Sequence, residues 1–246
     1  MVTGFELFFG LLIVVAAATV IGTVGFGFGL VAIPVLLLYL EPQQTVVVSN
    51  SLIGIIMAMV LMRTWRHLKL RASIGLVIGG VVATPVGVLV LNSASPGALR
   101  MTIAIVIIFL GLLSLSKIQL PFAQRRLAGA TFGFLTSLAN TTIGIGGPLG
   151  AIYSMAQGWK AETVRAVLAL FFLTSDIVAF VLYAATGLVG RDTLANIGVM
   201  TPGLFVGFVV SSLLANRINE RVFRYAVVVV IVVAGSMTLL RELSVV

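Results

Sequence analysis

Apolar runs separated by short polar segments follow one another along the whole chain. They cover residues 4–24, 30–40, 44–62, 73–91, 98–116, 126–140, 147–157, 162–186, 194–215 and 222–240. Because an α-helix rises about 1.5 Å per residue, about 20 apolar residues cross a hydrocarbon core roughly 30 Å thick. The pattern predicts membrane-spanning helices, except at 30–40 and 147–157, which are too short to span. A membrane β-barrel would alternate apolar and polar residues, which segments such as 227–233 do not.

A glycine-rich interruption precedes each of the two short runs. The first break is the Gly-Phe-Gly-Phe-Gly stretch 25–29, and the second break is the Gly-Ile-Gly-Gly-Pro stretch 144–148. Glycine is a poor helix former, so a helix is expected to stop and start again at each break. We expect two broken helical hairpins, whose short half-helices begin near Leu30 and Leu149. Pro148 fits such a start, because a proline in the first turn of a helix loses no hydrogen bond.

The chain also matches itself in a regular order. Sliding the sequence along itself places Gly27 on Gly144, Thr45 on Thr163, Gly87 on Gly207 and Arg100 on Arg224. The offsets are 117, 118, 120 and 124 residues, and they increase steadily, as small insertions would make them. The common order predicts two homologous repeats, 1–120 and 121–246, which together form a single transmembrane domain.

Clusters of basic residues predict the orientation of the spans. Arginine and lysine gather at 63–71, 117–126 and 217–224, and loops rich in these residues stay in the cytoplasm. The span 44–62 then starts outside, whereas 162–186 starts inside. The fold class we predict is therefore an all-α polytopic membrane bundle of two inverted-topology repeats, with both termini outside. Each repeat would be a glycine-broken helical hairpin followed by three transmembrane helices, and lengths leave open whether the hairpins are re-entrant or full spans.

Composition narrows the classes of function and of partner. Hydrophobic residues make up 60% of the chain and charged residues 9%, against about 25% charged in soluble domains, so lipid is an expected partner. The net charge of +8 comes from short clusters without interleaved aromatic residues, so nucleic acid is not an expected partner. Cysteine is absent and histidine occurs once, in a basic loop, so we expect neither a metal site nor a cofactor.

Helices interrupted at matching positions of inverted repeats are typical of a transporter site near the bilayer midplane. A helix that starts inside the membrane leaves amide N–H groups unpaired, and each such group in hydrocarbon costs several kcal/mol. The positive end of the helix dipole favours an anion as the ligand that satisfies them. The candidate substrate-binding residues are Gly25, Gly27, Gly29, Ser49, Asn50, Asn140, Thr141, Thr142, Gly144, Gly146, Gly147 and Arg165. The alternative is that these small residues only let helices pack closely.

Two charged residues lie within one predicted span. Asp176 is deep inside 162–186, where a charge is costly, so it is the candidate coupling residue, with protons as one coupling ion. The alternative is a protonated carboxyl or one bonded to a neighbouring hydroxyl such as that of Ser175. Arg165, near the start of the same span, could attract an anion at the cytoplasmic entrance. Its alternative role is to reach the lipid headgroups.

The stretches 25–34, 144–149 and 162–176 resemble the sulfite exporter TauE/SafE family. The resemblance is carried by a glycine-rich segment that leads to Pro34 and by its counterpart in the second repeat. It implies a multi-pass permease of the bacterial or archaeal inner membrane that exports sulfite or a small organosulfonate. Transport would occur by alternating access, with the site near the two broken hairpins. The chain departs from the family pattern at two positions, and both affect the expected size of the pocket. Phe28 stands where the family often has a third glycine, and Pro148 stands at the corresponding, closely packed position of the second repeat.

Other classes of function fit the sequence less well. An intramembrane zinc protease needs a His-Glu-x-x-His pattern and a membrane serine protease needs a buried base, and neither is present, so we do not expect an enzyme. A cation channel would need a ring of acidic residues. A permease for another small anion, such as a carboxylate or an inorganic sulfur species, and a non-transporting membrane scaffold are kept as alternatives. The coupling ion, the direction of transport and a homodimeric state are left open.

Overall fold

The computed structural model describes residues 4–113 and 128–214, and all regular elements in this part of the chain are helices, without a strand. The elements are α1 (Phe5–Val24), α2 (Phe28–Leu36), α3 (Pro42–Thr64), the 3₁₀ turn η1 (Trp65–His67), α4 (Leu70–Ser93), α5 (Pro96–Leu113), α6 (Ala128–Ile143), α7 (Gly147–Ala156), α8 (Ala161–Ala185) and α9 (Arg191–Leu214). The all-α prediction is confirmed. The predicted span 222–240 and the basic clusters at 117–126 and 217–224 lie outside the described residues.

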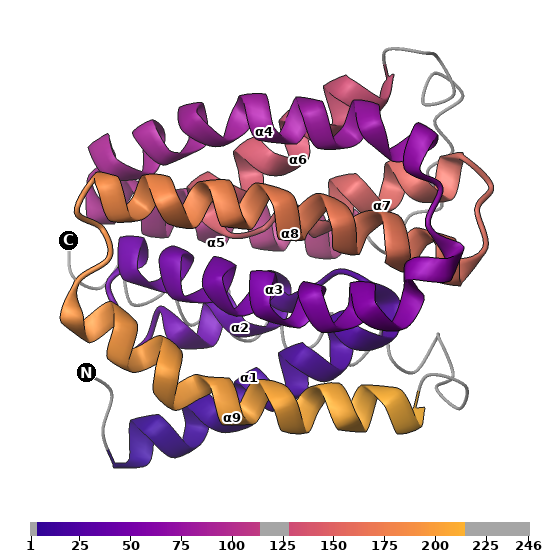
Figure 1. Ribbon diagram of the computed structural model, residues 1–246. Coiled ribbons are helices and arrows are strands. Elements are labelled where there is room, and N and C mark those ends of the chain that lie inside the picture. The colour runs from indigo at the N-terminus through magenta and orange to yellow at the C-terminus, as the bar shows by residue number, and fades with distance from the viewer. Residues whose placement is uncertain (1–3, 114–127, 215–246) are drawn as a thin grey trace.

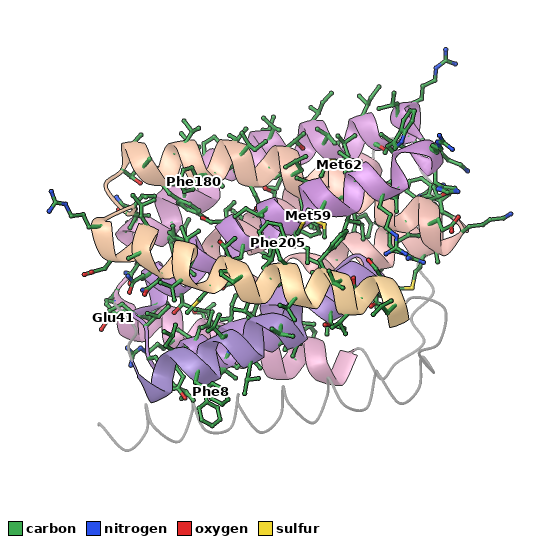
Figure 2. All side chains as sticks on the ribbon, turned by 60° about the horizontal axis from the view of Figure 1, so that its bottom comes forward. Phe8, Glu41, Met59, Met62, Phe180 and Phe205 are labelled. Carbon is green, nitrogen blue, oxygen red and sulfur yellow. The ribbon has the colours of Figure 1, made fainter. Side chains whose placement is uncertain are left out.

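Five of the described helices are long and apolar enough to cross a membrane. They are Leu7–Val24, Pro42–His67, Leu70–Ser93, Ala161–Ala185 and Arg191–Leu213. Their outer faces carry large apolar side chains, and Phe8, Met62 and Phe205 are each at least half exposed. Figure 2 shows Phe8 projecting away from the bundle. A soluble protein rarely leaves so much apolar surface in water, whereas lipid tails solvate it well.

The half-helices begin two residues earlier than the sequence analysis expected. α2 starts at Phe28 and α7 at Gly147, instead of near Leu30 and Leu149. The reason is local, because each interruption is confined to three residues, 25–27 and 144–146, and a helix resumes directly after them. Gly27 has a φ of 100°, in the left-handed region that favours glycine, and the chain resumes a right-handed helix at the next residue.

Helices α3 and α8 pack side by side at the centre of the bundle, and the other helices surround them. In Figure 1, α4, α8, α3 and α9 follow one another from top to bottom. α4 also packs against α6, α9 against α1, α2 against α1, and α7 against α6. These contacts form matching sets. If α1, α2, α3 and α4 correspond to α6, α7, α8 and α9, the contact of α4 with α6 corresponds to that of α9 with α1. The contact of α4 with α8 then corresponds to that of α9 with α3.

Glycines bring the backbones of α4 and α6 into close contact. A Cβ atom at Gly79 would clash with the carbonyl group of Ala130, and one at Gly133 would clash with that of Leu76. On the other side of the bundle, a Cβ at Gly207 of α9 would meet the carbonyl oxygen of Val15 at 2.5 Å. Small residues at such contacts let membrane helices approach closely, so these pairs are held by dense backbone packing.

The two broken hairpins leave the bundle at opposite ends of α4. After α2, Gln43 donates a hydrogen bond to the carbonyl oxygen of Ala94 (3.1 Å), and Glu41 lies 3.6 Å from Arg100. These contacts join the end of the first hairpin to the α4–α5 connection. After α7, Glu162 pairs with His67 at 2.9 Å, which joins the end of the second hairpin to the α3–α4 connection.

Candidate functional site

The two glycine-rich breaks lie against each other, although 117 residues separate Gly27 from Gly144 along the chain. A Cβ atom at Gly29 would clash with the carbonyl oxygen of Gly144. A Cβ at Gly147 would lie 3.1 Å from the backbone nitrogen of Gly27. The segment between α1 and α2 therefore contacts the segment between α6 and α7 through their backbones.

Each break ends one helix and starts another without a side-chain cap. The amide of Gly25 donates to the carbonyl of Ile21 (2.7 Å) and closes α1, and that of Gly144 donates to Asn140 (2.8 Å) and closes α6. Within residues 4–113 and 128–214, no side chain accepts a hydrogen bond from the first turn of α2 or of α7. The first amides of a helix have no acceptor within that helix, so the start of α2 presents N–H donors beside this contact. At the start of α7, Pro148 has no N–H and Leu149 donates to the carbonyl of Gly146 (3.1 Å), so Gly147 supplies the amide donor there.

A small hollow lies where the breaks meet. Both breaks line it, together with apolar side chains that include Ile21 of α1, Ile53 of α3 and Phe172 of α8. Asn140 of α6 supplies the polar side chain of the lining. The cavity volume is about 10 Å³, which is the size of one water molecule. A sulfur oxyanion is larger than this hollow.

A buried hydrogen-bond network extends from Asn140 to α3 and α8. The Asn140 side-chain amide donates to Asp176 Oδ1 (2.8 Å), and the Asn140 carbonyl accepts from the side-chain amide of Asn50 (2.9 Å). The same Asn50 nitrogen donates to the Tyr183 hydroxyl (3.0 Å), which donates to the carbonyl of Thr141 (2.7 Å). Each of Asn50, Asn140, Asp176 and Tyr183 is at most 3% exposed. The network therefore connects the hollow to the central helix pair out of contact with solvent.

Several oxygens of this region have no hydrogen-bond partner among the described residues. They are Asp176 Oδ2, Asn50 Oδ1, Ser49 Oγ and Ser175 Oγ. The hydrogen bond between Asp176 and Ser175 that the sequence analysis considered is absent, because Asn140 takes the carboxyl group instead. Buried polar atoms normally have partners, so this group of oxygens has unused capacity to bind a proton, a water molecule or an ion.

The predicted binding residues divide into those at the hollow and those away from it. Gly27, Gly29, Asn140, Gly144 and Gly147 line the hollow. The hydroxyl groups of Thr141 and Thr142 donate to the carbonyls of Ser137 (2.8 Å) and Gly87 (3.4 Å), which ties them to helix packing. Gly146 packs against the carbonyl of Thr136. Ser49 is buried in α3, outside the lining of the hollow.

Arg165 lies beside the first break. A Cβ atom at Gly25 would be 3.1 Å from the Cγ atom of Arg165, so the stem of the arginine side chain packs along the break. The residue is half-buried, and its Nε atom has no acceptor among the described residues. Glu162, one turn earlier, is engaged by His67. A cationic group with unused hydrogen-bonding capacity therefore flanks the break at the η1 end of the bundle.

The sequence analysis missed Tyr183 and the apolar walls of the hollow. Tyr183 follows Asp176 by seven residues, which is about two helical turns and places both on one face of α8. That spacing was a usable signal. Ile53 and Phe172 carry no such signal, since they are ordinary apolar residues of spanning helices. Within the described ranges, no group of three His, Asp or Glu side chains comes together as a metal site would require.

Comparison with known proteins yields one match. The model of a family described as Sulfite exporter TauE/SafE matches residues 10–238, which is nearly the whole chain and includes both breaks. No curated protein matches the chain, and no solved structure matches it.

Proposed function

The chain belongs to the sulfite exporter TauE/SafE family, and we propose that it exports sulfite or a small organosulfonate through a site at the two breaks. Family membership and the apolar helices make it a multi-pass membrane protein of a transporter family. The observation that carries the finer proposal is the contact between two uncapped helix starts, at Gly27 and Gly147.

The main-chain amides at the starts of α2 and α7 would bind the anion. Each helix start carries the positive end of a helix dipole, and glycine allows an oxygen of the ligand to approach the backbone. Sulfite and sulfonates present three oxygens, each of which accepts hydrogen bonds. The side-chain amide of Asn140 would add a donor at the same place. Arg165, beside the first break, would attract the anion from the cytoplasmic side.

Alternating access would open the hollow to one side of the membrane and then to the other. With a volume of about 10 Å³, the hollow must widen before an anion can enter, which fits an occluded state of a transport cycle. The matching sets of helix contacts and the opposite exits of the two hairpins support two inverted repeats, 1–120 and 121–246. Rocking of such repeats about a fixed site is the general mechanism of inverted-repeat transporters.

The lining of the hollow bears on the substrate. Ile21, Ile53 and Phe172 are apolar and suit the short carbon chain of an organosulfonate. Amide donors recognise any small oxyanion, so a permease for a carboxylate or for another inorganic sulfur species is the second candidate. The inner membrane is the proposed location, and no catalytic step is proposed.

The proposal is tested by flux of labelled sulfite in liposomes that contain the purified protein. The Gly147→Ala variant should lower the flux at least about tenfold, because its methyl group would crowd Gly27 and Phe26 across the hollow. The matched control is Gly198→Ala on α9, where no atom lies within 4 Å of the added Cβ. A scaffold predicts no flux with the unchanged protein, and that result would refute transport.

A further inference from the structure

We propose that Asp176 binds the proton that is coupled to anion transport, and that Asn140 transmits the effect of this proton to the anion site. Protonated Asp176 would favour an anion in the hollow, and an occupied hollow would favour the protonated carboxyl group. The inference rests on the proposed function, because it assigns a regulating ion to the same site.

Asp176 has one carboxyl oxygen that is free to bind a proton. Its Oδ1 atom accepts a hydrogen bond from Asn140, whereas Oδ2 has no partner among the described residues, and the residue is 3% exposed. α3 covers it closely, since a Cβ atom at Gly54 would lie 3.3 Å from the Asp176 Cβ. An ionised carboxylate in such a place loses its hydration, whereas the protonated form needs no counter-ion.

No cation faces Asp176 from the helices packed against it in the described structure. α6 and α7 contain no charged residue, and the charged residues of α3 and α4 are Arg63 and Arg71, at the ends next to η1. On α8 itself, Arg165 precedes Asp176 by eleven residues, which is about 16 Å along the helix. The titratable neighbour is Tyr183, whose hydroxyl is engaged with Asn50 and Thr141. Binding of a proton is therefore the simplest way to neutralise the negative charge of this carboxyl group.

Asn140 connects the carboxyl group to the hollow. Its side-chain amide donates to Asp176, and the residue also lines the cavity between the breaks. An anion in that cavity and an ionised Asp176 would repel each other through a poorly screened interior. Binding of the anion should therefore raise the affinity of Asp176 for a proton. By linkage, the proton must raise the affinity for the anion by the same factor.

A sodium ion is the rival occupant that the experiment must distinguish. Three oxygens have no partner in the part of the chain that the structure describes, and oxygen is the ligand type that hard cations take. They are Asp176 Oδ2, Asn50 Oδ1 and Ser175 Oγ. A cation needs several of these oxygens around one point, whereas a proton needs only the carboxyl oxygen that the geometry already leaves free. The structure shows such a free carboxyl oxygen, Asp176 Oδ2, so the ion that we propose is a proton.

The test is calorimetric binding of ethanesulfonate to the full-length purified protein, from about pH 5 to about pH 9. Ethanesulfonate keeps one fixed charge over this range, whereas sulfite itself takes up a proton. The expected affinity is constant on the acidic side and falls by up to tenfold per pH unit on the alkaline side, because protons then leave Asp176. Repeating the titration in buffers of different ionisation enthalpy should show uptake of up to one proton per anion on the alkaline side.

Three variants assign the effect to Asp176. Asp176→Asn keeps the shape and the neutrality of the protonated carboxyl group, so it should bind ethanesulfonate at every pH with the affinity that the unchanged protein shows in acid. Asp192→Asn, at the exposed start of α9, is the matched control and should keep the original pH profile. His67→Gln should also keep it, which excludes the histidine that pairs with Glu162.

The outcomes separate this inference from the function on which it rests. If the unchanged protein binds neither ethanesulfonate nor sulfite, the proposed function fails and the coupling fails with it. If it binds with an affinity independent of pH, or if the pH dependence survives in Asp176→Asn, only the coupling is overturned. Binding that requires sodium but takes up no proton also overturns it. Should Asp176→Asn fail to fold, the affinity profile and proton count of the unchanged protein still decide.

Discussion

Asn140 is the residue in which the parts of the candidate site meet. It lines the hollow, its side chain holds Asp176, and its carbonyl group accepts hydrogen bonds from Asn50 and from the amide of Gly144. These contacts place one side chain between the proposed anion site and the proposed coupling group. Asn140 was a candidate from the sequence because it lies four residues before the second break.

Replacing Asn140 by alanine should weaken both binding and the fold. The change removes a donor from the hollow and leaves Asp176 Oδ1 unpaired, so we expect sulfite flux to fall at least about tenfold. The free energy of unfolding should fall by about 1–3 kcal/mol, the usual cost of an unsatisfied buried polar group. Flux in liposomes and unfolding in mixed detergent measure the two effects.

The matched control for this change is Asn92→Ala, at an exposed position of α4. Equal flux in Asn140→Ala and Asn92→Ala would remove Asn140 from the site. The bond between Asn140 and Asp176 could not be predicted from sequence, because it depends on how α6 packs against α8. Both residues were candidates on their own, since each is polar in an apolar span, but their partnership is a property of the packing.

At the scale of elements, the apolar pattern predicted the described helices well. The breaks were recognisable because glycine-rich stretches interrupt otherwise continuous apolar runs. The exact starts of α2 and α7 were displaced by two residues, because each non-helical break spans only three residues, 25–27 and 144–146. The size of the hollow between them could not be predicted, since it depends on how side chains such as Ile53 and Phe172 pack around it.

The α4–α6 contact should tolerate enlargement poorly. Gly79→Val would place a branched side chain against the backbone of Ala130, where neither helix can yield without moving. We expect a loss of about 1–3 kcal/mol in the free energy of unfolding, as overpacking usually causes. Gly198→Val is the control, since its side chain would enter open space on α9. Similar stability of the two variants would contradict the close packing of α4 and α6.

At the scale of the whole molecule, the account depends on two halves with opposite orientation. The matching helix contacts were not predictable from sequence, because internal matches of single residues say only which segments correspond. Two contacts support the opposite orientation, because they place the ends of the two hairpins at opposite ends of α4. They are the contacts of Gln43 with Ala94 and of His67 with Glu162. Inverted repeats stay a prediction that labelling can test.

The chain contains no cysteine, so single cysteines can be introduced without background. We expect a cysteine at Glu41, after the first hairpin, to react with a membrane-impermeant maleimide added outside intact cells. A cysteine at Lys160, after the second hairpin, should react only after the membrane is permeabilised. Ser95→Cys, in the α4–α5 connection, is a control for the outer side. Labelling of Glu41→Cys and Lys160→Cys from the same side would rule out inverted halves.

The most direct measurement is an experimental structure of the protein with bound selenite, a heavier analogue of sulfite whose selenium scatters anomalously. We predict one anomalous peak between Gly27 and Gly147, in a hollow wider than the present 10 Å³, with oxygens at hydrogen-bond distance from the first amides of α2 and α7. Selenite bound elsewhere, with the two breaks still in contact and the hollow still closed, would contradict the account.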